Sequence, residues 1–297
     1  MKKFVVVMLI AVVIAGLGFS AQKVIGFAVS TLANPFFVSM KEGGEAKAAE
    51  LGLEMIVLDA QDSSEKQYSQ IQDLITRNVD VLIVNPCDSD AVVPAVMEAK
   101  MMGIPVITVT RPANGIEVNQ HLDIDNKEAG MLAAEALVEA LDGTGKIAVL
   151  EGIPGAPSAN DRQAGFMAVI DQYDGLEVVT SLTANYSREE GARVMEDVLQ
   201  GNPELDAVYA HNDEMALGAV RAIVAAGRMN EIKVFGIDAV DDAIMAIKNG
   251  EMVATVKQQP ALQMAMAVEA ANDIINGKTV EKLVIVPLQL ITIEQIQ

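Results

Sequence analysis

The stretch VIGFAVSTLANPFF, residues 24–37, sets the pattern on which the rest of the chain is built. Residues 24–30 form a short apolar run, as expected for a strand buried on both faces of a parallel sheet. A stretch of helical period, residues 35–51, begins inside the same segment and is followed by Gly52, a residue type that favours the end of a helix. The segment therefore predicts one strand followed directly by one helix.

The same alternation continues outward to the C-terminus, which is typical of a mostly parallel sheet covered by helices on both faces. Further apolar runs suited to buried strands span residues 53–59, 81–84, 104–109, 146–150, 178–182, 207–210, 233–237 and 253–257. The clearest helical stretches between them span residues 68–77, 91–102, 127–141, 162–172 and 188–200. The pattern restarts near residues 123–127, and 297 residues exceed an ordinary domain. We therefore predict two similar α/β domains rather than one long sheet.

The composition is that of an acidic globular protein. Hydrophobic residues make up 51% and charged residues 21%, which is enough apolar content for a sizeable core. Asp and Glu number 41 against 21 Lys and Arg, and the formal charge of -20 disfavours nucleic acids and anionic lipid surfaces as partners. A single cysteine, Cys87, and two histidines exclude an intrachain disulfide, a thiolate cluster and a multi-histidine metal site.

Residues 1–21 have the features of a secretory signal peptide. Two lysines precede an apolar run, residues 4–19, and the small residues Gly18 and Ser20 allow cleavage before Ala21. A membrane anchor is the alternative, but the run is shorter than the roughly 20 residues that a spanning helix needs. No cysteine directly follows the run, so a lipid anchor is not supported. We expect export across the inner membrane, a periplasmic location and cleavage just before or just after Ala21.

The sequence lacks the motifs of several common enzyme classes. No strand is followed by the GxGxxG spacing of a dinucleotide site, and DGTGK, residues 142–146, lacks the first glycine and the final Ser or Thr of a phosphate loop. HExxH, GxSxG and CxxC do not occur, and residues 123–126 fall short of a calcium loop. We therefore predict that the protein is not an enzyme and has no catalytic residues, cofactor or metal.

Polar and aromatic side chains follow several predicted strands, at the edge where open parallel sheets bind ligands. These residues are Ser30, Asn34, Phe36, Phe37, Asn85, Thr110, Arg111, Arg162, Tyr186, Asn212, Asp238 and Gln258. Amides, carboxylates and guanidiniums satisfy sugar hydroxyls, which both donate and accept, while aromatic rings pack against the C–H faces of a sugar. Each residue alone has an ordinary explanation as a helix cap or core residue, but their recurrence in both halves predicts a sugar site.

Four segments also carry a family resemblance. They are VSTLANPFFVSMKEG (29–43), LIVNPCDSDAV (82–92), GIPVITVTR (103–111) and HNDEMALGA (211–219). Through them, the chain from Lys23 onward resembles the periplasmic sugar-binding proteins of the ribose-binding type, which serve ABC importers. The resemblance implies the type I periplasmic binding protein fold, an α/β fold of two Rossmann-like lobes with parallel sheets joined by a three-segment hinge.

The resemblance also implies how the lobes divide and work. The first lobe comprises residues 22–124 and about 260–287, and the second comprises about 125–259 and 288–297. The family's ligand contacts fall on Ser30, Asn34, Phe36, Phe37, Asn85 and Arg111 in the first lobe, on Arg162, Tyr186, Asn212 and Asp238 in the second, and on Gln258 by the hinge. One sugar or polyol binds between the lobes, which close on it and dock on the transmembrane subunits of an ABC permease.

At two positions the sequence departs from the ribose-binding pattern. Thr110 stands where ribose binders have an aspartate before the arginine, and Tyr186 stands at a phenylalanine position. Without that carboxylate, we expect Asp238 to be the single anionic acceptor opposite two arginines. The hypothesis that follows is a ligand that differs from ribose in one hydroxyl, a related pentose, polyol or cyclitol, or one with partial negative charge. In the alternative, the Thr110 hydroxyl accepts the same ligand hydroxyl through its own oxygen.

Three other functions stay open on the sequence. A sugar-sensing partner of a chemoreceptor or histidine kinase has the same features, and a sugar-converting enzyme would use Asp238 as its base. A repressor core shares the two-lobed fold but needs a DNA-reading headpiece, where this chain has the predicted signal peptide. We interpret Asp213 and Glu214 as caps of the helix that ends near Ala226, rather than as catalytic acids.

Overall fold

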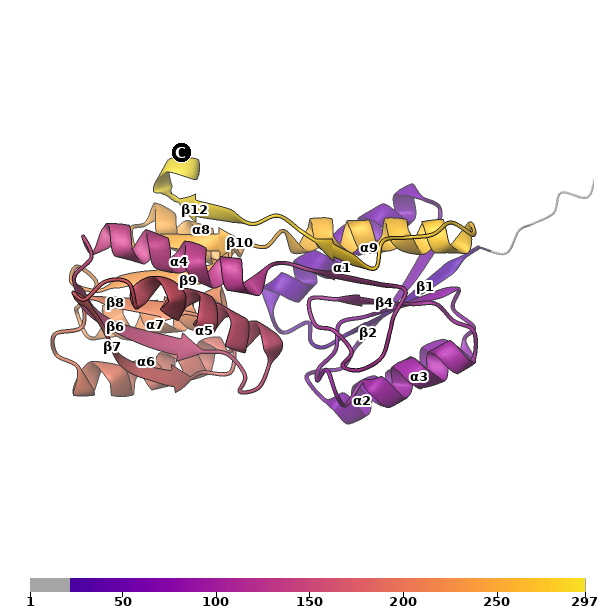
Figure 1. Cartoon of the computed structure of the whole chain (residues 1–297), viewed down its shortest axis with the longest axis horizontal. Coiled ribbons are helices and arrows are strands. Elements are labelled where there is room, and N and C mark those ends of the chain that lie inside the picture. The colour runs from indigo at the N-terminus through magenta and orange to yellow at the C-terminus, as the bar shows by residue number, and fades with distance from the viewer. Residues whose placement is uncertain (1–21, 297) are drawn as a thin grey trace, which may run out of the picture.

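The computed structural model describes residues 22–296, so the predicted signal peptide lies outside the described residues. These residues form two lobes side by side, each a six-stranded sheet covered by helices (Figure 1). The strand order is β11-β5-β4-β3-β1-β2 in the first sheet and β12-β10-β9-β8-β6-β7 in the second. The predicted fold of two parallel-sheet lobes is confirmed. No helix in this part of the chain combines the length and apolar character required to span a bilayer.

The first sheet lies between two pairs of helices. Its strands are β1 (Val24–Val29), β2 (Glu54–Asp59), β3 (Val81–Val84), β4 (Val106–Val109), β5 (Gln120–Asp123) and β11 (Leu283–Ile285). The helices are α1 (Pro35–Glu50) and α9 (Pro260–Ile275), which pack together on one face, and α2 (Ser64–Thr76) and α3 (Val93–Met101) on the other. Every residue of β3 and β4 is buried, which is why β3 is an unbroken apolar run and β4 is interrupted only by Thr108.

The second sheet is built in the same way. Its strands are β6 (Gly145–Glu151), β7 (Leu176–Thr183), β8 (Ala207–Ala210), β9 (Lys233–Asp238), β10 (Ala254–Lys257) and β12 (Gln289–Thr292). The helices α4 (Asn126–Ala140) and α5 (Pro157–Ile170) cover one face, and α6 (Arg188–Gly201), α7 (Asp213–Ala225) and α8 (Asp241–Lys248) cover the other. A short 3-10 helix, Ile293–Gln295, follows β12.

Three segments connect the lobes, because the chain passes from one sheet to the other after β5, after β10 and after β11. The last passage leads into β12, which pairs antiparallel with β10. The strands β5, β11 and β12 are not among the strands that the sequence predicts. They are short and mostly half-exposed edge or near-edge strands, and so lack the apolar runs of the central ones.

Two glycines bring α4 and α5 into close backbone contact. A Cβ at Gly130 would lie 2.1 Å from the carbonyl oxygen of Arg162, and a Cβ at Gly165 would lie 2.0 Å from that of Lys127. The absence of both side chains therefore lets the first turn of α4 lie directly against the helix that carries Arg162. This contact sets the distance between Arg162 and Asn126, the first residue of α4.

Candidate ligand-binding cleft

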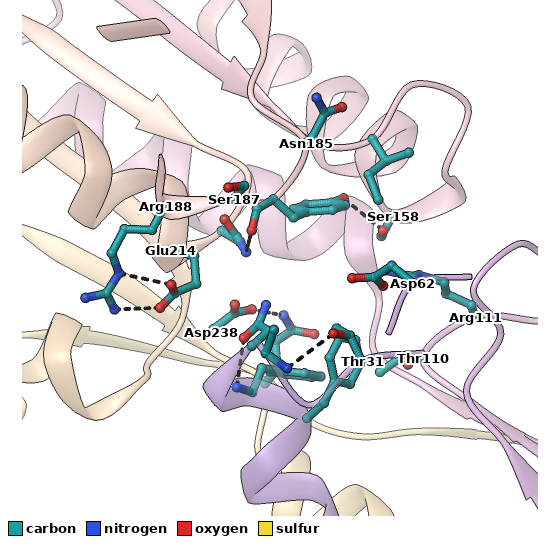
Figure 2. Close-up of a pocket in the computed structure, with 18 of the residues that line it drawn as sticks. Thr31, Asp62, Thr110, Arg111, Ser158, Asn185, Ser187, Arg188, Glu214 and Asp238 are labelled. Carbon is teal, nitrogen blue, oxygen red and sulfur yellow. Dashed lines mark hydrogen bonds and ion pairs between the residues drawn. The ribbon is translucent and has the colours of Figure 1, made fainter. Parts of the chain in front are cut away.

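A cavity of about 390 Å³ opens between the carboxyl ends of the strands of both sheets. Figure 2 shows side chains from the two lobes facing one another across it. Ten of the twelve residues that the sequence singles out line this cavity: Asn34, Phe36, Phe37, Thr110, Arg111, Arg162, Tyr186, Asn212, Asp238 and Gln258. Residues far apart in the sequence thus meet at one place, as the strand-end argument requires.

Ser30 and Asn85 lie behind the cavity wall instead of in it. Both are fully buried, and the Ser30 hydroxyl donates to Oδ1 of Asn85 at 2.6 Å. The Asn85 amide donates to the carbonyl oxygen of Val109 at 3.1 Å and, in a very short contact, to Oγ1 of Thr110. In this structure Ser30 therefore orients Asn85, and Asn85 holds Thr110 in place from behind the cavity wall; direct contact of these two residues with the ligand stays a prediction.

Aromatic rings stand on both sides of the cavity. Phe36 and Phe37 form an edge-to-face pair with ring centroids 5.1 Å apart, and the Arg111 guanidinium lies 5.9 Å from the Phe37 ring centroid. On the second lobe the Tyr186 hydroxyl lies 2.9 Å from Oγ of Ser158. The tyrosine hydroxyl is therefore already engaged by its own lobe, while its ring provides a stacking surface.

Arg162 is a buried polar group of the second lobe that two hydrogen bonds hold in place. It is only 6% exposed, its Nε donates to Oδ1 of Asn126 at 3.0 Å, and its Nη1 donates to the carbonyl oxygen of His211 at 2.6 Å. Gly152 donates its N–H to Nδ1 of His211, which leaves the imidazole proton on Nε2, facing Gln163. Burial, with the charge of Arg162, lowers the pKa of His211 to about 3, so the ring is neutral.

A buried carboxylate lies beneath the same wall. Gln258 donates to Oδ1 of Asp238, which is 5% exposed and has φ 138°. Burial raises the pKa of Asp238 well above its usual range, although the charge of Arg162 acts in the opposite direction. Asp238 thus has one amide donor and a nearby guanidinium, and it presents a desolvated acceptor to the cavity.

Helix α7 begins at the cavity, and its first residues do not act as the helix caps that the sequence predicts. Asn212 caps the helix, because its Oδ1 accepts the N–H of Met215 at 3.0 Å. Asp213 instead accepts from Oγ1 of Thr255 at 2.7 Å and from the N–H of Val240 at 3.0 Å. Glu214 accepts two hydrogen bonds from Arg188, at 3.0 and 2.7 Å. Neither acid is a cap; Asp213 ties α7 to strand β10, and Glu214 ties it to α6.

Asp213 gives the fold a pH dependence that can be measured. Burial raises the pKa of Asp213 from an ordinary value of 3.8 to about 6, so between these values the folded state binds the proton more tightly than the unfolded state. Stability from this group is complete at low pH and is lost as the pH rises through about 6. Relative to Asp213→Asn, the wild type should lose on the order of 1 to 3 kcal/mol across that window. Urea unfolding of both proteins at pH 4, 5, 6 and 7 tests this; a constant difference contradicts it.

The sequence analysis missed several lining residues. These are Thr31, Ala33, Asp62, Asp123, Asn126, Ile153, Ser158, Asn185, Ser187, Arg188, Glu189 and Glu214. With them, five carboxylates and three guanidiniums line the cavity, so Asp238 is not its single anionic acceptor. The expected positive balance is therefore wrong, and with it the argument for a ligand with negative charge. Asp62 follows the predicted strand at residues 53–59, so the strand-end rule applied to that strand as well would have found it.

A cleft between two lobes that are joined by three short segments defines a class of protein that holds its ligand between moving domains. The chain belongs to the periplasmic binding protein domain family, whose model matches residues 25–279. Its resemblance to the ribose-binding type is also confirmed. It is 46% identical to the ribose import binding protein RbsB of Bacillus subtilis. The alignment spans 268 residues, which are 90% of this chain and 87% of that protein.

Solved structures show the same fold with ligands bound. An ABC transporter solute-binding protein from Bacillus halodurans, with bound myo-inositol, superposes with a TM-score of 0.88 at 37% identity, covering 94% of this chain and 97% of that one. An ABC transporter solute-binding protein from Actinobacillus succinogenes, with bound D-allose, superposes with a TM-score of 0.88 at 33% identity. The match covers 92% of this chain and 99% of that one. These relatives are binding proteins of transporters. Among residues 22–296, no cluster of His, Cys, Asp and Glu suited to a metal ion is present.

Proposed function

We propose that this chain is the exported sugar-binding component of an ABC importer. It binds one neutral sugar, polyol or cyclitol in the cleft, performs no chemistry on it, and delivers it to the permease from the periplasm. The observation that carries this proposal is the cavity itself, which is lined from both lobes by aromatic rings and by amide, carboxylate and guanidinium groups. These are the groups that replace the water around a polyhydroxylated ring.

The proposed mechanism is closure of the lobes around the ligand. We assign residues 22–124 and 260–287 to the first lobe and residues 125–259 and 288–296 to the second. Away from the connecting segments, no hydrogen bond or ion pair between the described side chains bridges the cleft. Contacts to both lobes therefore arise only when a ligand lies between them, and this difference in affinity stabilises the closed state. The three connecting segments absorb the rotation.

The charge of the lining favours a neutral ligand. Five carboxylates and three guanidiniums line the cavity, so an anionic sugar would meet net repulsion. Of the acids, Glu214 is paired with Arg188, whereas Asp62 and Asp238 have no ion-pair partner within the described chain. Unpaired carboxylates accept hydrogen bonds from ligand hydroxyls, and these charge-assisted bonds are the strong ones.

Ligand binding should appear as thermal stabilisation. We expect at least one of D-ribose, D-allose, xylitol and myo-inositol to raise the melting temperature by about 5 to 10 °C when present at about 100 times its dissociation constant. The anionic sugar D-ribose 5-phosphate, added at the same concentration, serves as the matched control and should have no effect. Solution scattering with the effective ligand should show a smaller radius of gyration, and NMR should recover that ligand unchanged. Turnover without compaction would replace this proposal with an enzyme.

A further inference from the structure

The turn after β2 holds Asp62 at the cavity by a strained backbone. Gln61 and Asp62 have φ values of 54° and 57°, in the left-handed region that residues other than glycine seldom occupy. The N–H of Asp62 donates to the carbonyl oxygen of Ser30 at 2.7 Å, which ties this turn to the end of β1. Consecutive strained residues persist only where the surrounding structure demands them, and they gather at ligand sites.

Asp62 and Arg111 place a carboxylate acceptor and a guanidinium donor side by side on the first-lobe wall. Both line the cavity, and Figure 2 shows Asp62 extending toward its centre beside Arg111. Nη1 of Arg111 donates to the carbonyl oxygen of Pro86 at 2.9 Å, which orients the guanidinium and leaves its other N–H groups available. Partial shielding from water raises the pKa of Asp62, whereas the charge of Arg111 and the nearby Thr31 hydroxyl lower it.

The other acceptors on this wall are already engaged. Asp123 accepts the N–H of Ile124 at 2.8 Å through Oδ1, and its Oδ2 lies 3.6 Å from Nε2 of His121. The Thr110 hydroxyl donates to the carbonyl oxygen of Val109 at 2.6 Å and accepts from the Asn85 amide, so its proton and one lone pair are in use. Of the two first-lobe carboxylates that line the cavity, Asp62 is the one that accepts no backbone N–H and has no histidine beside it in the described part of the chain, so it is the better placed to meet a ligand.

We propose that Asp62 is a specificity-determining residue of the cleft, and that it supplies to the ligand the carboxylate that position 110 lacks. On closure, a ligand hydroxyl donates to Asp62 while its oxygen accepts from Arg111. This reading rests on the proposed function, because it assigns a contact within the same site. It also accounts for a neutral residue at position 110: both positions line the same cavity, so a carboxylate there would add to the negative charge that Asp62 already supplies.

The experiment is a set of calorimetric titrations with D-ribose, D-allose, xylitol and myo-inositol. The variants are Asp62→Asn, Thr110→Asp and the two together, and each replacement tolerates a left-handed backbone at least as well as the residue it replaces. Glu65→Gln is the matched control, because it removes the same charge from an exposed position on α2, outside the cavity. Thermal unfolding of each variant without ligand separates loss of binding from loss of the fold.

For the ligand that the wild type binds most tightly, Asp62→Asn should weaken binding about tenfold to a hundredfold, and Glu65→Gln should change it less than about twofold. Thr110→Asp should also weaken binding, and combining it with Asp62→Asn should restore most of the affinity. An effect of Asp62→Asn no larger than that of Glu65→Gln overturns the inference while the proposed function stands. If the double variant does not recover affinity, Asp62 does not take the place of a carboxylate at position 110. If the wild type binds none of the four probes, the inference falls together with the proposed function.

Discussion

Arg162→Ala is expected to weaken sugar binding at least about thirtyfold, equivalent to about 2 kcal/mol. The guanidinium is buried at the cavity, and Asn126 and the His211 carbonyl hold it in place without neutralising it. A preorganised charged donor loses little conformational entropy when it binds a ligand hydroxyl. Its removal therefore lowers the binding affinity more than removal of an exposed, mobile donor does. The variant also exposes Asp238 to the unopposed charge of Asp213, which favours the protonated acid and a weaker acceptor.

Titration calorimetry with the best ligand measures this effect. Arg221→Ala is the matched control, because Arg221 is an exposed residue of α7 in the same lobe and does not line the cavity. Arg162→Lys tests the geometry: it keeps the charge but loses the planar fork, and should fall between the wild type and the alanine variant. Affinity equal to that of Arg221→Ala would remove Arg162 from the ligand site.

Gly165→Ala is expected to lower the free energy of unfolding by about 3 kcal/mol or more. The new Cβ would lie 2.0 Å from the carbonyl oxygen of Lys127 and 2.8 Å from its carbonyl carbon, so backbone rather than a flexible side chain must move. Helices α4 and α5 would be forced apart. Because Asn126 begins α4 and Arg162 lies on α5, the separation should also break their 3.0 Å hydrogen bond and weaken ligand binding.

The control for this prediction is a glycine-to-alanine substitution at a position where the added Cβ meets no neighbouring atom. Gly201 ends α6 with nothing within 4 Å of an added Cβ, so Gly201→Ala should be neutral or stabilise the protein by up to about 1 kcal/mol. Denaturant unfolding of both variants, followed by circular dichroism, gives the comparison. Similar stability of the two variants would show that α4 and α5 adapt, and that the glycines do not set their spacing.

The central strands could be predicted from the sequence because burial on both faces leaves an unbroken apolar run. For β1, β3 and β4 the runs lie close to the observed bounds. Helix α9 is not among the clearest helical stretches of the sequence, because Ala and Met make it apolar on nearly every side, which weakens the helical period. The edge strands β11 and β12 form by pairing with segments that are distant in the sequence, and their own residues show no pattern that predicts this pairing.

The strand-end rule found most of the cleft because a parallel sheet sends every strand end to the same edge. It could not tell which side chains turn inward. Ser30 and Asn85 follow strands as Asn34 and Arg111 do, yet packing turns Ser30 toward Asn85 and Asn85 toward Thr110. Their hydrogen bonds form between β1, β3 and β4, which lie side by side only after the sheet is assembled.

By itself, then, the sequence determined the two-lobed parallel-sheet architecture, because strand burial is recorded locally in short apolar runs. It also determined most of the chemistry of the cleft, because residue types at strand ends are read directly. Only the tertiary structure decided the charge of the cavity. Asp62, Asp123 and Glu214 come from three separate elements, and whether a carboxylate meets a ligand, an arginine or a backbone N–H depends on neighbours that folding brings together.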